Sequence, residues 1–339
     1  MAKVTLQSIA DRVGVSRMTV SNAFSRPDQL SADLRERILA AAAELGYVGP
    51  DPAARALARG RTGSVGLMLN ERISEAFEDA VASEFLASVA DALATHGLAL
   101  TLLTRAEGTT FVPARDVAMD GVLVYICEPE SRDLAALDRR GLPQVAVDQN
   151  KRDGVPGVNV DDRGGARAAA QHVVDLGHTR VGILTLEVTS GDPARNYPSR
   201  ERMLGWREPL DAAGIEPAVR TVGYRPTGDA HARALELLSA PDRPTAILCF
   251  SDAFAVGAIS AAESLGLRVP EDVSVVGFDD SPLAGASRPP LTTVHQEVAA
   301  KGQAAVTALV TMLDGAAAPD DVLLPTSLVV RGSTAPPPA

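Results

Sequence analysis

The sequence predicts a protein in three parts: a small three-helix head that contains a helix-turn-helix, a hinge helix, and a two-lobed α/β core. Short capped helical stretches fill residues 1–62, whereas strand-like and helix-like runs alternate from Ser64 onward. Residues 1–62 hold 9 Lys and Arg against 6 Asp and Glu, and the rest of the 339-residue chain holds 23 against 37. A mildly basic head on an acidic core indicates that any nucleic acid would meet the head.

The head is expected to span residues 1–48. Thr5, Ser16 and Ser31 are each suited to cap the N-terminus of a helix, and Gly14 separates the first helix from the second. The third helix is expected to stop at Gly46. A small core comes from the apolar residues at 6, 9, 10, 13, 15, 20, 34, 38 and 45. This arrangement predicts a helix-turn-helix.

A hinge is expected at residues 49–62. Asp51 followed by Pro52 is a helix start, and Gly60 is suited to end the helix. The resulting helix of about eight residues would be marginal in water, and Leu57 is its one large apolar side chain. We therefore expect the hinge to fold when it meets a partner.

The core is expected to span residues 63–333. Strands are predicted at 64–70, 98–104, 121–127, 143–149, 180–186, 245–251 and 272–280, and helices at 84–97, 165–177, 201–214, 230–240, 253–266 and 297–315. This alternation implies parallel sheets with helices on both faces. About 270 residues exceed what one doubly wound domain needs, so two lobes are expected, with ligands bound between them at the carboxyl ends of the strands. Residues 334–339 are expected to be a disordered tail.

Several classes of function are excluded by what the sequence lacks. It has no nucleophile elbow, dinucleotide or phosphate-binding glycine motif, zinc-protease motif or C-x-x-C, so we expect no enzyme, cofactor or metal. No apolar run suits a membrane span and no secretory leader is visible, so a cytoplasmic, nucleoid-associated protein is expected. The acid pairs at 161–162 and 279–280 follow strands and indicate ligand-binding or helix-capping groups.

Several motifs occur in one order along the chain. These are "VTLQSIADRVGVSRMTVSNAF", "RERILAAAAELGYVGPDPAARAL", "HVVDLGHTRVGIL", "SVVGFDD" and "PPLTTVHQE". With them the chain resembles the LacI/GalR (lactose-repressor) family of bacterial transcriptional regulators over essentially its full length. The resemblance implies a periplasmic-binding-protein-like core. Gly49 departs from the family pattern as an additional residue before the hinge.

The second head helix carries the groups expected to read DNA. Arg17 suits guanine, Asn22 suits adenine, and Met18 suits a thymine methyl group. The resemblance implies that these three residues contact bases, and that Leu57 enters the minor groove as a wedge. Hydroxyl groups suited to the phosphate backbone are expected at Thr5, Ser16, Thr19 and Ser21.

The effector site is also implied by the resemblance. Arg202 and Asp279 match an arginine and an aspartate that commonly bind effector in the family, and further lining positions are expected at Asn70, Phe77, Asp148, Tyr224, Ser251, Asp252 and Gln296. The expected function is that of a dimeric repressor on a pseudo-palindromic operator, controlled by a small molecule, with a sugar favoured. A purine or sugar-phosphate co-repressor stays open. A solute-binding protein without a regulatory role would share the core but has no use for residues 1–62.

Overall fold

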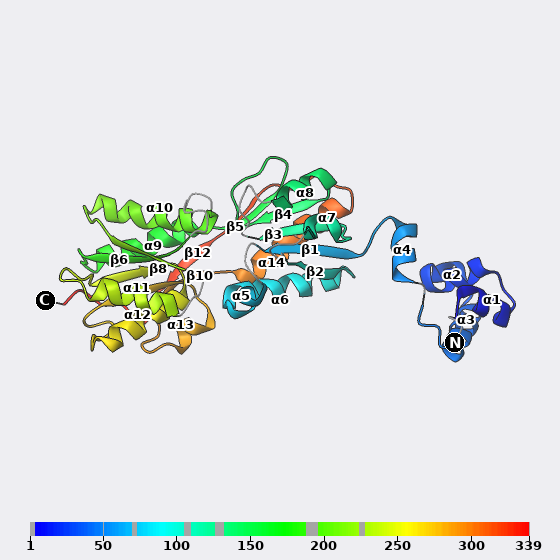
Figure 1. Cartoon of the computed structure of the whole chain (residues 1–339), viewed down its shortest axis with the longest axis horizontal. Coiled ribbons are helices and arrows are strands. Elements are labelled where there is room, and N and C mark those ends of the chain that lie inside the picture. Colours follow the sequence, from blue (N-terminus) through cyan, green and yellow to red (C-terminus); the bar gives the residue numbers. More distant parts are fainter. Residues whose placement is uncertain are drawn as a thin grey trace. The chain divides into compact units, whose positions relative to one another are not determined.

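The computed structural model describes residues 4–49, 51–69, 73–104, 110–125, 132–187, 196–223 and 228–338. The chain divides into two compact units, Met1–Gly63 and Ser64–Ala339 (Figure 1). The division lies one residue from the predicted start of the core. The first unit thus contains both the predicted head and the predicted hinge.

The first unit is helical throughout, as the sequence predicts. Its helices are α1 (Leu6–Val13), α2 (Arg17–Ser25), a 3-10 turn (Pro27–Gln29), α3 (Ala32–Glu44) and α4 (Pro52–Arg59). The predicted caps are present: the backbone N–H groups of Ser8, Thr19, Leu34 and Ala53 donate to the side chains of Thr5, Ser16, Ser31 and Asp51. Each cap satisfies a backbone donor that has no partner within its helix, which fixes where the helix begins.

The tight turn between α1 and α2 is made by Gly14, whose φ of +80° favours glycine. This turn lets Ile9 of α1 and Val20 of α2 pack with Ile38 of α3, and all three side chains are fully buried. Phe24 and Tyr47 close the cluster with an edge-to-face contact whose ring centroids lie 5.6 Å apart. The helix-turn-helix is thus held by a small apolar core of its own.

The second unit contains two six-stranded sheets. The first has the order β11-β5-β4-β3-β1-β2 and is parallel throughout. Its strands are β1 (Ser64–Leu69), β2 (Ala99–Leu103), β3 (Gly121–Tyr125), β4 (Gln144–Val147), β5 (Gly157–Val160) and β11 (Val322–Leu324). Apolar clusters cover both of its faces, with helices α5 (Ile73–Glu78), α6 (Ala80–Thr95) and α14 (Val298–Leu313) on one and α7 (Pro113–Asp116) and α8 (Arg132–Arg140) on the other.

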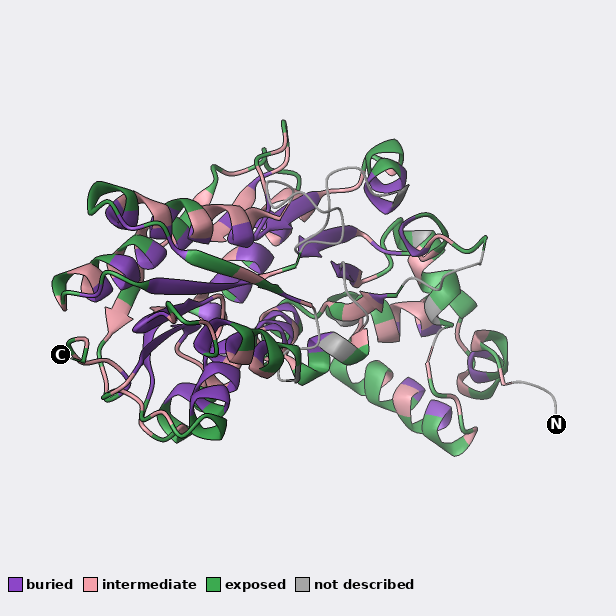
Figure 2. Cartoon of the chain, turned by 60° about the vertical axis from the view of Figure 1, so that its left-hand side comes forward, coloured by how far each residue is buried: buried purple, intermediate pink, exposed green. Residues whose placement is uncertain are grey.

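The second sheet repeats this plan with the order β12-β10-β9-β8-β6-β7. Only its edge strand β12 runs antiparallel. Its strands are β6 (Val181–Leu186), β7 (Ala218–Val222), β8 (Ala246–Cys249), β9 (Ser274–Asp279), β10 (Thr292–Gln296) and β12 (Thr326–Val329). Helices α9 (Asp162–Asp175) and α10 (Tyr197–Ala212) cover one face, and α11 (Gly228–Leu238), α12 (Asp252–Ser264) and α13 (Pro282–Ala286) the other. The prediction of sheets with helices on both faces is confirmed (Figure 2).

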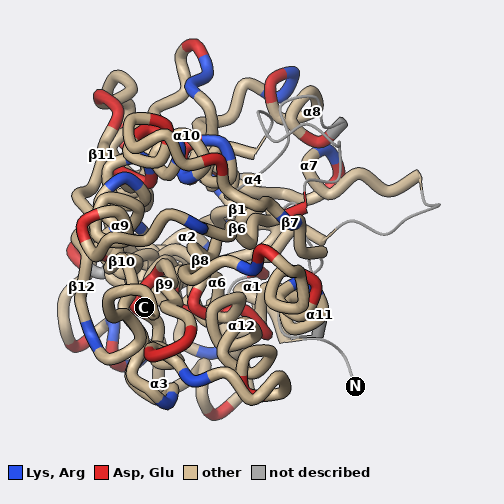
Figure 3. Tube along the Cα trace, turned by 90° about the vertical axis from the view of Figure 1, so that its left-hand side faces the viewer, with Lys and Arg blue, Asp and Glu red and all other residues tan. Residues whose placement is uncertain are grey.

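The chain crosses between the sheets at three points: from β5 into α9, from β10 into α14, and from β11 into β12. Each crossing follows the end of a strand. Lys, Arg, Asp and Glu residues occur mainly on helices and loops of the Cα trace (Figure 3). Asp279, the last residue of β9, is the one Lys, Arg, Asp or Glu residue in strands β1, β3, β4, β5, β6, β8, β9 and β10. Polar chemistry therefore begins where these strands end.

The prediction of a disordered tail from residue 334 is wrong at its start. The Thr334 hydroxyl lies 3.0 Å from His172 Nε2, and the Ala335 carbonyl accepts from His178 Nε2 at 2.9 Å. Ser274 at the start of β9 also bonds both backbone groups of Ala335 at 3.0 Å. The tail is ordered here because buried polar groups at the amino ends of the strands need these partners.

Candidate functional site

Helix α2 presents the predicted DNA-reading residues along one exposed side. Arg17 and Met18 are exposed in its first turn, and Met18 keeps 70% of its surface. Asn22 is half-buried and its amide donates to Gln29 Oε1 at 3.2 Å. An exposed methionine beside an arginine on a helix whose other side is buried gives a surface suited to base edges.

Three of the four hydroxyl residues predicted for the phosphate backbone, Thr5, Ser16 and Thr19, lie at helix starts. Ser16 Oγ caps α2 by accepting from the Thr19 N–H at 3.0 Å and lies 2.8 Å from Thr19 Oγ1. Thr5 caps α1 in a reciprocal pair with Ser8. Ser21 is half-buried in the middle of α2. Helix N-termini favour anions, so Thr5 and Ser16 occupy positions that suit phosphates.

Helix α4 carries Leu57 with 87% of its surface exposed. The side chain therefore does not join the apolar core of the head. Asp51 caps this helix, Pro52 begins it and Gly60 ends it in the left-handed region at φ +69°. Gly49 has φ +116°, a backbone conformation that other residues rarely adopt, so the additional residue before the hinge is suited to be glycine.

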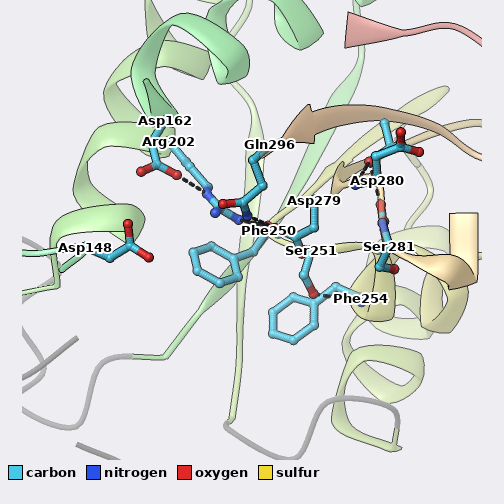
Figure 4. A network of polar contacts seen from close by, with 12 residues as sticks. Asp148, Asp162, Arg202, Phe250, Ser251, Phe254, Asp279, Asp280, Ser281 and Gln296 are labelled. Carbon is cyan, nitrogen blue, oxygen red and sulfur yellow. Dashed lines mark hydrogen bonds and ion pairs between the residues drawn. The ribbon is translucent and has the colours of Figure 1, made fainter. Parts of the chain in front are cut away.

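In the second unit, four of the predicted effector residues join one buried polar network (Figure 4). Asp148 follows β4, Asp279 and Gln296 end β9 and β10, and Arg202 lies on α10. All four are at most 8% exposed. Gln296 Nε2 donates to Asp279 Oδ1 at 2.7 Å, and Arg202 Nη1 lies 3.6 Å from the same oxygen. Three of these residues lie at the carboxyl ends of strands, Asp148 in the first sheet and Asp279 and Gln296 in the second, where open α/β sheets bind ligands.

Arg202 is held on all sides. Its Nε donates to Asp162 Oδ1 at 2.8 Å, and its Nη1 donates to the Phe250 carbonyl. The guanidinium carbon also lies 3.6 Å from the centroid of the Phe278 ring and 4.5 Å from that of Phe250. Burial alone would lower the pKa of Arg202, but the Asp162 and Asp279 charges outweigh it, and this pKa is raised.

Backbone conformation marks the same place. Among the described residues, three non-glycine residues have positive φ: Asp148 at 51°, Asp279 at 112° and Asp280 at 57°. Such conformations cost free energy and concentrate at functional sites. Two of these three residues belong to the network, and the Asp280 carboxylate instead pairs with Arg331 and His295 at 2.6 and 3.1 Å.

Comparison with known proteins agrees with this architecture. Residues 5–49 match the family of bacterial regulatory proteins described as lacI, and residues 170–334 match a periplasmic binding protein-like domain. A transcriptional regulator of helix-turn-helix type from Mycolicibacterium smegmatis is 38% identical over 362 positions, which cover 99% of this chain and 98% of that protein. This chain belongs to the lacI family. It is therefore a DNA-binding transcriptional regulator and not an enzyme.

Two solved structures of lacI-family proteins resemble the whole chain. A complex of the transcriptional regulator CelR with cellobiose has a TM-score of 0.71 and 30% identity, and covers 98% of this chain and 100% of that one. The lac repressor dimer bound to operator and the anti-inducer ONPF has a TM-score of 0.81 and 28% identity, and covers 98% and 99%. The expected fold is thus confirmed over both units.

The remaining predicted effector residues of this lacI-family chain bond residues outside the network, are exposed, or lie outside the described residues. Ser251 caps α12 by accepting from the Phe254 N–H at 3.3 Å. Both Asp252 oxygens are engaged, one by Thr293 Oγ1 at 2.5 Å and the other by the Ser281 N–H at 2.7 Å. Phe77 on α5 is 59% exposed. Asn70 and Tyr224 lie outside the described residues.

Burial shapes the titration of the aspartates in this lacI-family core. It raises the pKa of Asp279 well above its usual value, although Arg202 and Gln296 oppose the change. It likewise raises the pKa of Asp252 to about 6, although hydrogen bonds from Thr293 and Ser281 stabilise the charged form. A charged carboxylate at the end of one of these strands therefore costs free energy unless a hydrogen-bond donor reaches it.

Sequence reasoning missed Lys301 and the specific role of Asp162. Lys301 on α14 is 1% exposed, and its ammonium donates to Asp148 Oδ2 at 2.5 Å and to Gln296 Oε1 at 3.2 Å. Asp161 caps α9 as the acid pair suggested, while Asp162 pairs with Arg202. A lysine within the apolar run 298–313 was the one available signal, since a buried lysine needs a partner.

The described residues contain neither a metal-site cluster nor a helix that could span a membrane. In the part of the chain that the structure describes, no group of His, Cys, Asp and Glu side chains has the arrangement of a metal site. Across the same residues, no helix combines the length and hydropathy that a bilayer span requires.

Proposed function

We propose that this regulator is a repressor that binds a pseudo-palindromic operator as a homodimer and is controlled by a small polyhydroxylated molecule, a sugar. The operator would be bound by residues 1–62 of two chains. The effector would be bound by residues of the 63–333 core. Operator binding also implies a cytoplasmic protein on the nucleoid.

The observation that carries this proposal is the buried network of Arg202, Asp279 and Gln296 where strands of the second sheet end. Arginine, carboxylate and amide groups present donors and acceptors in fixed directions, which suits the hydroxyl groups of a sugar. Two similar solved structures support the same assignment, since one is a CelR–cellobiose complex and the other is a lac repressor dimer bound to operator.

DNA recognition would divide among the head residues according to chemistry. Arg17, Met18 and Asn22 would contact bases in the major groove, and Thr5, Ser16, Thr19 and Ser21 would contact phosphates. Leu57 would insert into the minor groove where the two hinges of a dimer meet. The two-fold symmetry of such a dimer is the reason to expect a pseudo-palindromic site.

Control would operate through the crossings between the sheets. Asp162 and Gln296 lie beside two of the three crossings, so a ligand that bonds the network would bias the angle between the lobes. That change would alter the spacing of the paired hinges and destabilise their DNA-supported fold. Coupling of this kind is reciprocal, because DNA must weaken effector binding by the same factor.

The test is a DNA-release assay on the full-length protein. A specific site is first selected from random-sequence DNA, and neutral sugars are then titrated into the complex. Release by a sugar that also raises the melting temperature of the free protein supports the proposal. Tighter DNA binding with the sugar would identify a co-repressor instead, and a protein that selects no sequence would contradict the proposal.

A further inference from the structure

Two buried carboxylate oxygens of the polar network have no donor among the described residues. They are Asp148 Oδ1 and Asp162 Oδ2. The other oxygen of each group is engaged, by Lys301 Nζ at 2.5 Å and by Arg202 Nε at 2.8 Å. The two aspartate side chains are only 5% and 1% exposed. A buried carboxylate oxygen without a donor is costly, so these two atoms indicate where donors from a bound molecule belong.

The two oxygens are also the two ends of one chain of contacts. From one end to the other, the chain runs through Asp148, Lys301, Gln296, Asp279, Arg202 and Asp162. The amide of Gln296 is oriented by its neighbours, since its oxygen accepts from Lys301 and its nitrogen donates to Asp279. Asp279 Oδ1 and Gln296 Oε1 are occupied within the chain of contacts, whereas the two buried oxygens without a donor lie at its ends.

Both ends are held in position by their surroundings. Lys301 lies beside the stacked rings of Phe85 and Tyr125, with its nitrogen 5.9 and 5.7 Å from their centroids. The next residue, Gly302, allows α14 to approach α6 so closely that a Cβ there would lie 1.8 Å from Ser88 Oγ. At the other end, Arg202 is fixed by two aromatic rings. Neither cation is therefore free to turn and cover the open oxygens.

The charges of this chain of contacts favour a ligand without negative charge. Three carboxylates face two cations, and burial together with the Asp148 charge raises the pKa of Asp162 although Arg202 opposes it. Another anion placed at the open ends would meet repulsion from Asp148 and Asp162 without gaining a free cation among them. Hydroxyl groups instead supply the missing donors.

We propose that Asp148 and Asp162 each accept one hydrogen bond from the effector, so that the site selects a molecule with two donor groups and no negative charge and rejects phosphorylated sugars. Lys301 and Arg202 act as positioning residues that hold the inner oxygens. This assignment rests on the proposed effector control, and it decides between the neutral sugar and the sugar phosphate that the sequence leaves open.

The test compares Asp148→Asn and Asp162→Asn with wild type in the full-length protein. An amide keeps the shape of the side chain and still accepts from Lys301 or Arg202, but it places a donor where the open oxygen was. Each variant is expected to lose at least about tenfold in affinity for a neutral sugar, as expected for a charged hydrogen bond. Asp321→Asn is the matched control, because the Asp321 carboxylate accepts from Lys151 and the Gly157 N–H, which are not members of the network.

The ligands are glucose, ribose, the terminal phosphate ester of each sugar, and glucosamine. Calorimetry measures the binding affinity of each ligand. Binding of a neutral sugar that both Asn variants lose and its phosphate ester does not share supports the proposal. Tighter binding of glucosamine would also support it and would identify an ammonium as one donor. Equal or tighter binding of a phosphate ester overturns it, and so does unchanged neutral-sugar affinity in both variants.

DNA affinity is measured separately with the same ligands, which keeps the two proposals distinguishable. A neutral sugar that binds wild type, fails to bind the Asn variants and leaves DNA affinity unchanged would support the donor assignment while contradicting effector control. A phosphate ester that binds and releases DNA would support effector control and overturn the donor assignment.

Discussion

At the residue scale, Arg202 organises the polar network of the core. It bonds Asp162 and the Phe250 carbonyl while its guanidinium lies against the Phe278 ring. Lysine offers neither the planar fork nor the stacking surface that these contacts use. The residue type is therefore specified by geometry as well as by charge.

Arg202→Lys is expected to lower the free energy of unfolding by about 3 kcal/mol, because one ammonium cannot replace the guanidinium contacts with Asp162, Asp279 and the Phe250 carbonyl together. Denaturant unfolding measures the loss. The control is Arg207→Lys, whose pairs with Glu216 and Asp211 are exposed and are expected to contribute less than about 1 kcal/mol. Similar losses in the two variants would show that Arg202 does not have this central position.

Arg17→Ala is expected to cost about 1–3 kcal/mol of binding free energy on the selected site and little on random DNA, because it removes the proposed base contact. Fluorescence anisotropy on both DNAs measures the difference. Arg37→Ala on the exposed side of α3 serves as the control. An equal loss on both DNAs would assign Arg17 to a phosphate contact.

Single residues could be predicted where a local or family pattern names them. Arg202, Asp279 and Gln296 were predicted for one site and do lie together. Lys301 was missed because its partner Asp148 is 153 positions away, and no local pattern reveals that pairing. Asp252 begins α12, and its two oxygens are already engaged by Thr293 and Ser281, which lie 41 and 29 positions away in the sequence.

At the element scale, the head helices could be predicted almost to the residue. Thr5, Ser16, Ser31 and Asp51 act through hydrogen bonds within three residues, so the sequence contains the whole interaction. The C-terminal segment is the opposite case. Its order depends on His172, His178 and Ser274, which are remote in sequence. The short or polar strands β5, β7, β10, β11 and β12 were missed for the same reason, since their sheets rather than their sequences define them.

Helix α4 gives a prediction about DNA binding. Leu57→Ala is expected to weaken binding to the selected site by more than about tenfold, because it removes the proposed minor-groove wedge. The melting temperature is expected to stay unchanged, because the side chain is 87% exposed and stabilises nothing in the free protein. Leu204→Ala on α10, where the leucine is 41% exposed, is the control. Unchanged DNA affinity in the Leu57 variant would exclude the wedge.

The anchored C-terminal segment gives a pH prediction. Burial lowers the pKa of His178 below its usual 6.5. The unfolded chain therefore binds the proton first, and this group's contribution to stability is lost as pH falls below about 6.5. Unfolding measured across this range should show a weaker loss in His178→Gln than in wild type, with exposed His96→Gln as the control. Identical pH profiles for wild type and the His178 variant would contradict this.

At the scale of the whole molecule, the sequence predicted two units of opposite charge and a core of two sheets, and the structure has both sheets. The three crossings could not be predicted, because they require knowing which strands share a sheet. They matter for function, since Asp162 and Gln296 lie beside crossings and also belong to the polar network. A ligand at the network would therefore act on the segments that join the lobes.

A molecule bound at this network and a DNA site bound at the head are expected to control each other. The most direct measurement is the affinity of a neutral sugar ligand for the free protein and for the protein saturated with its selected DNA site. DNA is expected to change sugar affinity by the same factor by which sugar changes DNA affinity. Equal sugar affinity in the free and DNA-bound protein would contradict it.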